Sequence, residues 1–211
     1  MPNNKPSSPQ WLEWAREIQS LAQIGFTYAE NDFQRERNQR LTELAAEIVA
    51  EHSNLTATGI NSNFRVQPGY ATPKVDVRGA VFRDGKILMV REKLDDGWTM
   101  PGGWADVSDF PAESAEREVW EESGFKVKAT KLIGVYDANR VVPMEFYHAY
   151  KLVFLCEIIG GEATTSIETT DVQFYAVDEI PQNFAGERTR QRHVDDAFAA
   201  FRNPEIPTVF D

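Results

Sequence analysis

The chain has 211 residues, enough for one large domain or two small ones with a sizeable core. Its formal net charge of −11 argues against a general nucleic-acid or anionic-membrane surface, because both require clustered Lys and Arg. No apolar run reaches the ~18 residues of a membrane span, and the polar start MPNNKPSSPQ lacks a secretion signal. The single cysteine, Cys156, excludes an internal disulfide and fits a reducing compartment, so we expect a cytoplasmic protein.

Apolar residues at helical spacing predict a helical N-terminal domain over residues 1–60. Two stripes carry this prediction: Trp11, Ala15, Ile18 and Ala22 in the first, and Leu41, Leu44, Ala45, Ile48 and Val49 in the second. Asn31 followed by Gln34 resembles a capping box, which would begin the second helix. Two such helices cannot bury both faces alone, so they should pack on the rest of the chain or on a second copy. Pairing about a two-fold axis is the commonest arrangement, and we expect a homodimer.

The composition changes between Ser53 and Pro73 to Asn, Ser, Thr, Gly and Pro without a period. We therefore predict a linker over residues 61–73 and a second domain over residues 74–211. This domain should open with a strand pair, because Asp84-Gly85 signals a tight turn between two apolar runs.

A helix is predicted from Pro111 to the residue before Gly124, since proline suits the first helical position and glycine the position after the last. Glu118, Glu121 and Glu122 then share one face, at i, i+3 and i+4. Like charges four apart repel by roughly 0.2–0.5 kcal/mol, and a divalent cation would remove this repulsion. Oxygen-rich ligands of this kind suit Mg²⁺ or Mn²⁺ and not Zn²⁺.

Three more strands and a closing helix follow. The strands are predicted at residues 126–135, 147–159 and 172–177, and the helix at 188–201. Helices on mixed strands indicate an α/β fold of the α/β/α sandwich type.

The stretch from Gly103 to Phe125 resembles the Nudix box, G-x5-E-x7-R-E-U-x-E-E-x-G-U, in which U is bulky and apolar. The matching positions are Gly103, Arg117, Glu118, Val119, Glu121, Glu122, Gly124 and Phe125. Asp109 stands where the family has Glu. The resemblance covers roughly residues 70–205 and implies the Nudix α/β/α sandwich with a mixed sheet. An acidic, solvated helix face is the alternative interpretation, which the flanking glycines and the arginine disfavour.

This resemblance implies a metal-dependent catalytic site. The implied metal ligands are Glu118, Glu122, Glu121 and the backbone carbonyl of Gly102. Glu121 would serve as a ligand or as the group that activates water. Arg117 would orient a glutamate, and Asp109 would hold Arg117 by an ion pair.

A carboxylate outside the box often serves as a ligand or base in this family. Glu168 precedes the strand predicted at residues 172–177, which is where such a residue lies in the family topology. Glu145 is the second candidate. For both, an ordinary exposed loop glutamate is an equally good interpretation.

Substrate binding requires cations and flat surfaces. Arg78 and Arg91 could hold a phosphate or ribose, or could be simple surface charges. Trp98 and Trp104 border the glycine loop and could stack on a base, with core packing as the alternative for each.

The Nudix resemblance implies hydrolysis of a nucleoside diphosphate linked to another group. The segment GFTYAENDFQRER is similar to the N-terminal module of one Nudix subgroup, which points to ADP-ribose or CDP-choline as the substrate. A house-cleaning nucleoside triphosphate pyrophosphatase is the second hypothesis. A non-catalytic nucleotide-binding module is the third, although such modules commonly lose the carboxylates that this chain keeps. Acidity disfavours an RNA-end pyrophosphohydrolase.

Overall fold

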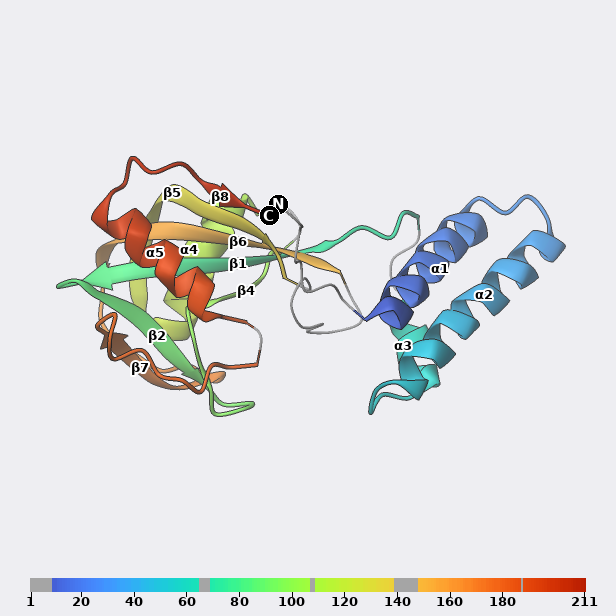
Figure 1. Ribbon diagram of the computed structural model, residues 1–211, viewed down its shortest axis with the longest axis horizontal. Coiled ribbons are helices and arrows are strands. Elements are labelled where there is room, and N and C mark those ends of the chain that lie inside the picture. Colours follow the sequence, from blue (N-terminus) through green and yellow to red (C-terminus); the bar gives the residue numbers. More distant parts are fainter. Residues whose placement is uncertain (1–8, 65–68, 107–108, 139–147, 187) are drawn as a thin grey trace. The chain divides into compact units, whose positions relative to one another are not determined.

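Figure 1 shows the computed structural model, which describes residues 9–64, 69–106, 109–138, 148–186 and 188–211. The chain divides into two compact units. One contains the chain up to Pro73 together with a later segment that ends at His148, and the other is built from Lys74–Ala138 and Ala149–Asp211. Among the described residues, no helix is both long enough and apolar enough to cross a membrane.

The described residues of the N-terminal unit form three helices: α1 (Gln10–Thr27), α2 (Asp32–Glu51) and α3 (Ala57–Phe64). Their shared core consists of Leu12, Ala15, Ala45, Ala46, Val49 and Ile60. The predicted pair of N-terminal helices is confirmed. The second apolar stripe is divided between two environments, because Ala45 and Val49 are buried while Leu41 and Leu44 are exposed.

The start of α2 is fixed by two reciprocal side-chain bonds. The Gln34 backbone N–H donates to Asn31 Oδ1 at 3.0 Å, and the Glu30 N–H donates to Gln34 Oε1 at 2.7 Å. Asn31 is therefore the N-cap expected from the sequence, and such a cap is worth about 0.5–2 kcal/mol.

The linker predicted over residues 61–73 is wrong at its beginning, because α3 continues to Phe64. The Gly59 N–H donates to Thr56 Oγ1 at 3.2 Å at the start of this helix, and Ile60 is buried against α1 and α2. A single apolar anchor in a run of Asn, Ser and Thr gives no periodic signal, so the helix depends on its tertiary contact.

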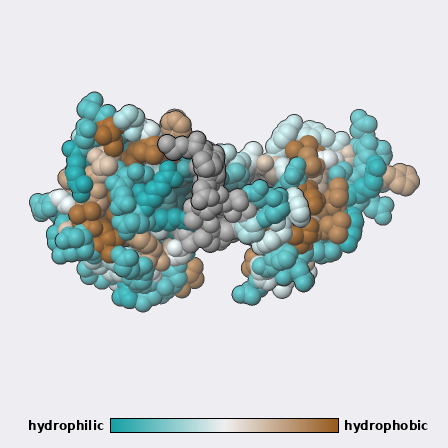
Figure 2. All heavy atoms as spheres, in the orientation of Figure 1, coloured by the Kyte–Doolittle hydropathy of each residue, from teal (hydrophilic) through white to brown (hydrophobic). Residues whose placement is uncertain are grey.

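Large apolar side chains gather on the surface of the N-terminal helices, where Figure 2 shows a hydrophobic area. Trp14, Leu21 and Phe33 are more than half exposed. Exposed apolar surface of this kind is typical of a region that contacts another protein.

The second unit is organised around an eight-stranded mixed sheet with the path β3-β2-β1-β6-β5-β8, to which β4 is added on β1 and β7 on β2. The strands are β1 (Lys74–Arg83), β2 (Lys86–Glu92), β3 (Trp98–Thr99), β4 (Gly102–Trp104), β5 (Phe125–Asp137), β6 (Ala149–Gly161), β7 (Thr169–Tyr175) and β8 (Val209–Phe210). The β1–β2 turn lies at Asp84-Gly85, as predicted, and both residues have positive φ. The central pair β1–β6 is parallel.

Helices α4 (Pro111–Ser123) and α5 (Gln191–Arg202) cover opposite faces of the sheet, and Figure 1 shows α5 crossing in front of the strands with α4 behind them. On the α4 face, Val77 and Val81 pack against Val119. On the α5 face, Ala80 belongs to the cluster that contains Phe198. Alternate residues of β1 thus serve the two layers. The α/β/α sandwich with a mixed sheet is confirmed.

Candidate active site

The glycine loop leading into β4 places backbone directly against α4. Gly102 has φ 147°, and a Cβ there would lie 2.0 Å from the Val77 carbonyl oxygen, so only glycine fits. A Cβ on Gly103 would lie 2.9 Å from a carboxylate oxygen of Glu118. The missing side chains therefore allow the α4 carboxylates to approach the loop backbone.

Glu122 is the buried member of the α4 carboxylates, with 5% of its surface exposed. It accepts a hydrogen bond of 3.0 Å from the Gly102 N–H. Burial raises the pKa of Glu122 to about 8; Arg78 and the Gly102 N–H act in the opposite direction, and the Glu118 charge adds to the increase. A cation at this carboxylate would offset the cost of burying its charge.

Arg117 forms ion pairs with several carboxylates in and beside the box. Its guanidinium lies 2.9 Å from Glu118, 3.0 Å from Glu121, 3.2 Å from Asp109 and 3.0 Å from Asp106. The expected Asp109–Arg117 pair is therefore present, even though the aspartate is one methylene shorter than the family glutamate. Glu118 is mostly buried and Glu121 is about half exposed, so the three α4 glutamates lie in different environments.

A further carboxylate, Glu92, was missed by the sequence analysis. It lies at the end of β2, has 8% of its surface exposed and is opposite Thr169 of β7. The strand register shifts between Arg91 and Glu92, and such a bulge redirects a side chain. Burial raises the pKa of Glu92, with Arg188 opposing the increase. Only the position of a charged residue at the end of the buried run ILMV could have indicated it.

Hydrogen bonds join the strand ends around Glu92 to α4 and to the segment before β7. Thr169 Oγ1 donates to the Glu122 carbonyl at 2.9 Å, and the Lys93 N–H donates to the Glu168 carbonyl at 2.8 Å. The charge of Glu168 contributes to raising the pKa of Glu92. Glu168 itself is exposed and directly precedes β7, so it lies at the rim of the carboxylate group. Glu145 lies outside the described residues.

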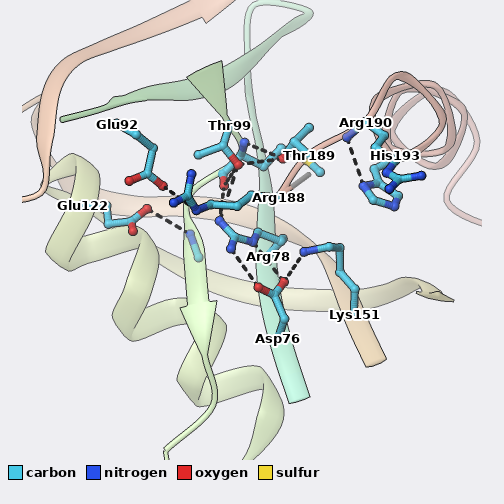
Figure 3. A network of polar contacts seen from close by, with 12 residues as sticks. Asp76, Arg78, Glu92, Thr99, Glu122, Lys151, Arg188, Thr189, Arg190 and His193 are labelled. Carbon is cyan, nitrogen blue, oxygen red and sulfur yellow. Dashed lines mark hydrogen bonds and ion pairs between the residues drawn. The ribbon is translucent and has the colours of Figure 1, made fainter. Parts of the chain in front are cut away.

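Arg78 occupies the interior and not the surface. Its Nε and Nη2 donate to the two oxygens of Asp76 at 3.0 and 2.8 Å, and its Nη1 donates to the Met100 carbonyl at 3.2 Å. Figure 3 shows Lys151 on the other side of Asp76, to which it also donates. Arg78 therefore joins β1 to the strand end before the glycine loop.

The other predicted binding residues lie in different settings. Arg91 is partly exposed and pairs with Asp96 at 2.6 Å. Trp98 is buried in the core, where its ring meets Tyr175 edge-on at 5.1 Å. Trp104 is 42% exposed at the end of β4, so its ring remains accessible.

Within the part of the chain that the structure describes, no three His, Cys, Asp or Glu side chains stand close enough to hold a metal ion as they are. The donor chemistry nevertheless fits a hard divalent cation. Glu118 and Glu122 are carboxylates whose pKa burial raises, and each approaches a glycine of the loop. Oxygen from these two side chains and from the Gly102 carbonyl could hold Mg²⁺ or Mn²⁺.

This combination of a mixed sheet, a glycine loop and a helix rich in glutamates is that of a phosphoanhydride hydrolase. The chain belongs to the NUDIX family, whose domain matches residues 72–198. Residues 9–64 match a second family, described as a UDP-X-like, N-terminal oligomerisation domain.

Several known proteins are similar to this chain over most of its length. A Bacillus subtilis (strain 168) protein, provisionally named ADP-ribose pyrophosphatase YjhB, is 36% identical over 96% of this chain and 97% of its own. A crystal structure of a UDP-X diphosphatase is 29% identical, with a TM-score of 0.62, and covers 95% of this chain and 98% of its own. An ADP-ribose pyrophosphatase from Streptococcus suis 89-1591 is 32% identical with a TM-score of 0.61, over 66% of this chain and all of its own.

Proposed function

We propose that this Nudix hydrolase cleaves the diphosphate of a nucleoside diphosphate linked to another group, with ADP-ribose as the first substrate to test. The products would be a nucleoside monophosphate and a phosphorylated second group. The observation that carries the proposal is Glu122, a buried carboxylate that accepts the Gly102 N–H beside two further glutamates, Glu118 and Glu92. The names of the ADP-ribose and UDP-X relatives support this substrate class. CDP-choline belongs to the same class.

Mg²⁺ or Mn²⁺ is the proposed cofactor. Bound to carboxylate and carbonyl oxygens, such an ion neutralises phosphate charge and lowers the pKa of water. Glu118, Glu122 and the Gly102 carbonyl would hold it. Arg117 fixes the orientation of Glu118 and Glu121 through its ion pairs. Glu121 and Glu168 are the accessible carboxylates that could take a proton from water.

Of the two tryptophans that border the glycine loop, Trp104 is the one that can offer a flat surface to a base, since Trp98 is buried. Arg91 remains a candidate for a phosphate or ribose contact. We further propose that the protein is a cytoplasmic homodimer assembled through its N-terminal helices. Their match to an oligomerisation domain and their exposed Trp14, Leu21 and Phe33 support this assembly.

A substrate panel tests the proposed function. The protein is incubated with ADP-ribose, CDP-choline, NADH or dGTP, with Mg²⁺, Mn²⁺ or EDTA, and the products are separated by chromatography. We expect metal-dependent cleavage of a diphosphate-linked substrate at a higher kcat/KM than that of dGTP. Preference for dGTP would favour a triphosphate pyrophosphatase, and binding without cleavage of any substrate would favour a regulatory module.

A further inference from the structure

Arg188 lies next to the carboxylate group but outside the Nudix box. The backbone that carries it is bonded to the core: the Trp98 N–H donates to the Asn183 carbonyl at 2.8 Å, and the Ala185 N–H donates to the Trp98 carbonyl at 2.9 Å. The buried Thr189 Oγ1 accepts the Met100 N–H at 3.0 Å and contacts Thr99 Oγ1 at 2.8 Å. The position of Arg188 is therefore set by buried hydrogen bonds to the strand end before the glycine loop.

The side chain of Arg188 extends from this anchored backbone toward the acidic residues. Its Nη1 donates to Asp95 at 2.8 Å, while its Nε is 3.8 Å from Glu92, too far for a hydrogen bond. Figure 3 shows the guanidinium beside Glu92, near Glu122. The side chain is 24% exposed, so it can be reached from solvent.

The guanidinium of Arg188 still has a donor group available for a ligand, whereas the donors of Arg78 are bonded within the protein. Arg78 gives its donors to Asp76, Thr99 and the Met100 carbonyl. For Arg188, Nη2 has no hydrogen-bond partner among the residues that the structure describes, and the contact to Glu92 is long. An arginine presents its donors in a planar fork that matches two oxygens of a phosphate.

We infer that Arg188 is a substrate-positioning residue that binds non-bridging oxygens of the substrate diphosphate, and that Glu92 and Asp95 hold it for this purpose. The inference rests on the proposed function and names a further residue of the same site. The acidic surroundings supply the reason for this cation: a diphosphate entering beside Glu118, Glu122 and Glu168 meets like charge, and Arg188 offsets it. The bulge at Glu92 places that carboxylate where it faces Arg188.

The test compares Arg188→Ala and Arg188→Lys with a matched control, Arg202→Ala, which removes the same charge from an exposed position at the end of α5. The non-hydrolysable probe α,β-methylene-ADP is titrated by calorimetry in the presence of Mg²⁺, so no turnover is needed. We expect the Kd to rise about ten-fold or more in Arg188→Ala, since a hydrogen bond to a charged group is lost, and less in Arg188→Lys. Arg202→Ala should keep the wild-type Kd.

Glu92→Gln tests the positioning part of the inference. It should raise the Kd less than Arg188→Ala does, and the double variant should be no worse than Arg188→Ala alone, because Glu92 acts through Arg188. With a substrate that the wild type cleaves, the KM should also rise less in Glu92→Gln than in Arg188→Ala. An unchanged Kd and KM in Arg188→Ala would overturn the inference while leaving the proposed function intact. Wild-type binding without cleavage of any panel member would instead defeat the proposed function alone.

Discussion

Replacing Glu122 by Gln should stabilise the metal-free protein at high pH while abolishing metal-dependent turnover. Glutamine can keep the hydrogen bond from the Gly102 N–H, but it has no charge to bury. The shift of the Glu122 pKa from 4.5 to about 8 corresponds to on the order of 5 kcal/mol when the carboxylate is fully ionised. Because water and neighbouring groups relax around a buried charge, we expect a measured gain of about 2–5 kcal/mol.

The sign of this stability difference follows because the pKa of Glu122 is higher in the folded protein than in the unfolded chain. Below pH 4.5 both states hold the proton, so wild type and Glu122→Gln should differ little. As the pH rises from 4.5 to about 8, the unfolded wild type ionises first, so the free energy of unfolding of the wild type falls. The difference between the two proteins should therefore grow over this range and stay constant above it.

Urea unfolding in EDTA at pH 5 and pH 9 measures this difference. Glu113→Gln is the matched control, since Glu113 is exposed in the first turn of the same helix and its effect should change by less than about 1 kcal/mol. Saturating Mg²⁺ should then stabilise the wild type, by about 2.7 kcal/mol at a hundred times Kd, and not Glu122→Gln. An equal gap between wild type and Glu122→Gln at both pH values would refute the reasoning.

Three further predictions concern single features of the structure. Asp109→Glu should retain activity and Asp109→Asn should lose it modestly, because the pair with Arg117 is partly exposed; a loss as large as that of Glu122→Gln in a steady-state assay would make Asp109 a ligand. Gly79→Ala should destabilise by about 1–3 kcal/mol in urea unfolding, since its Cβ would lie 2.3 Å from Val119, whereas Gly160→Ala meets no atom within 4 Å; equal costs would argue against close α4 packing. Deleting residues 1–64 should give a monomer in light scattering; a full-length monomer at micromolar concentration would disprove the homodimer.

The sequence predicted α4 closely because its limits depend on local chemistry. Pro111 opens the helix, Gly124 ends it in the left-handed conformation, and the residues between alternate between core and carboxylate faces. The β1–β2 turn could also be predicted from local sequence, since Asp84-Gly85 is typical of a tight turn whose residues have positive φ. The box residues Glu118 and Glu122 followed from the same helix, so their approach to the glycine loop could be expected.

The parts that were missed depend on pairing between distant segments. Glu92 joins the site only because β2 pairs with β7 and bulges at that point, which no spacing within the sequence reveals. Arg78 was expected to hold a phosphate or ribose, or else to be a surface charge, but it is buried and its partners are Asp76, two residues away, and the Met100 carbonyl, beyond the hairpin. Lys151 reaches the same aspartate from β6. Sequence patterns therefore predict individual helices and turns more readily than the hydrogen bonds and ion pairs between distant segments.

Product analysis with ADP-ribose tests the central claim most directly. The protein is incubated with ADP-ribose and Mg²⁺, and AMP and ribose 5-phosphate are quantified over time beside the EDTA and Glu122→Gln controls. We expect equal amounts of the two products, formed by the wild type only when metal is present. Release of free phosphate or adenine, or equal turnover by Glu122→Gln, would contradict it.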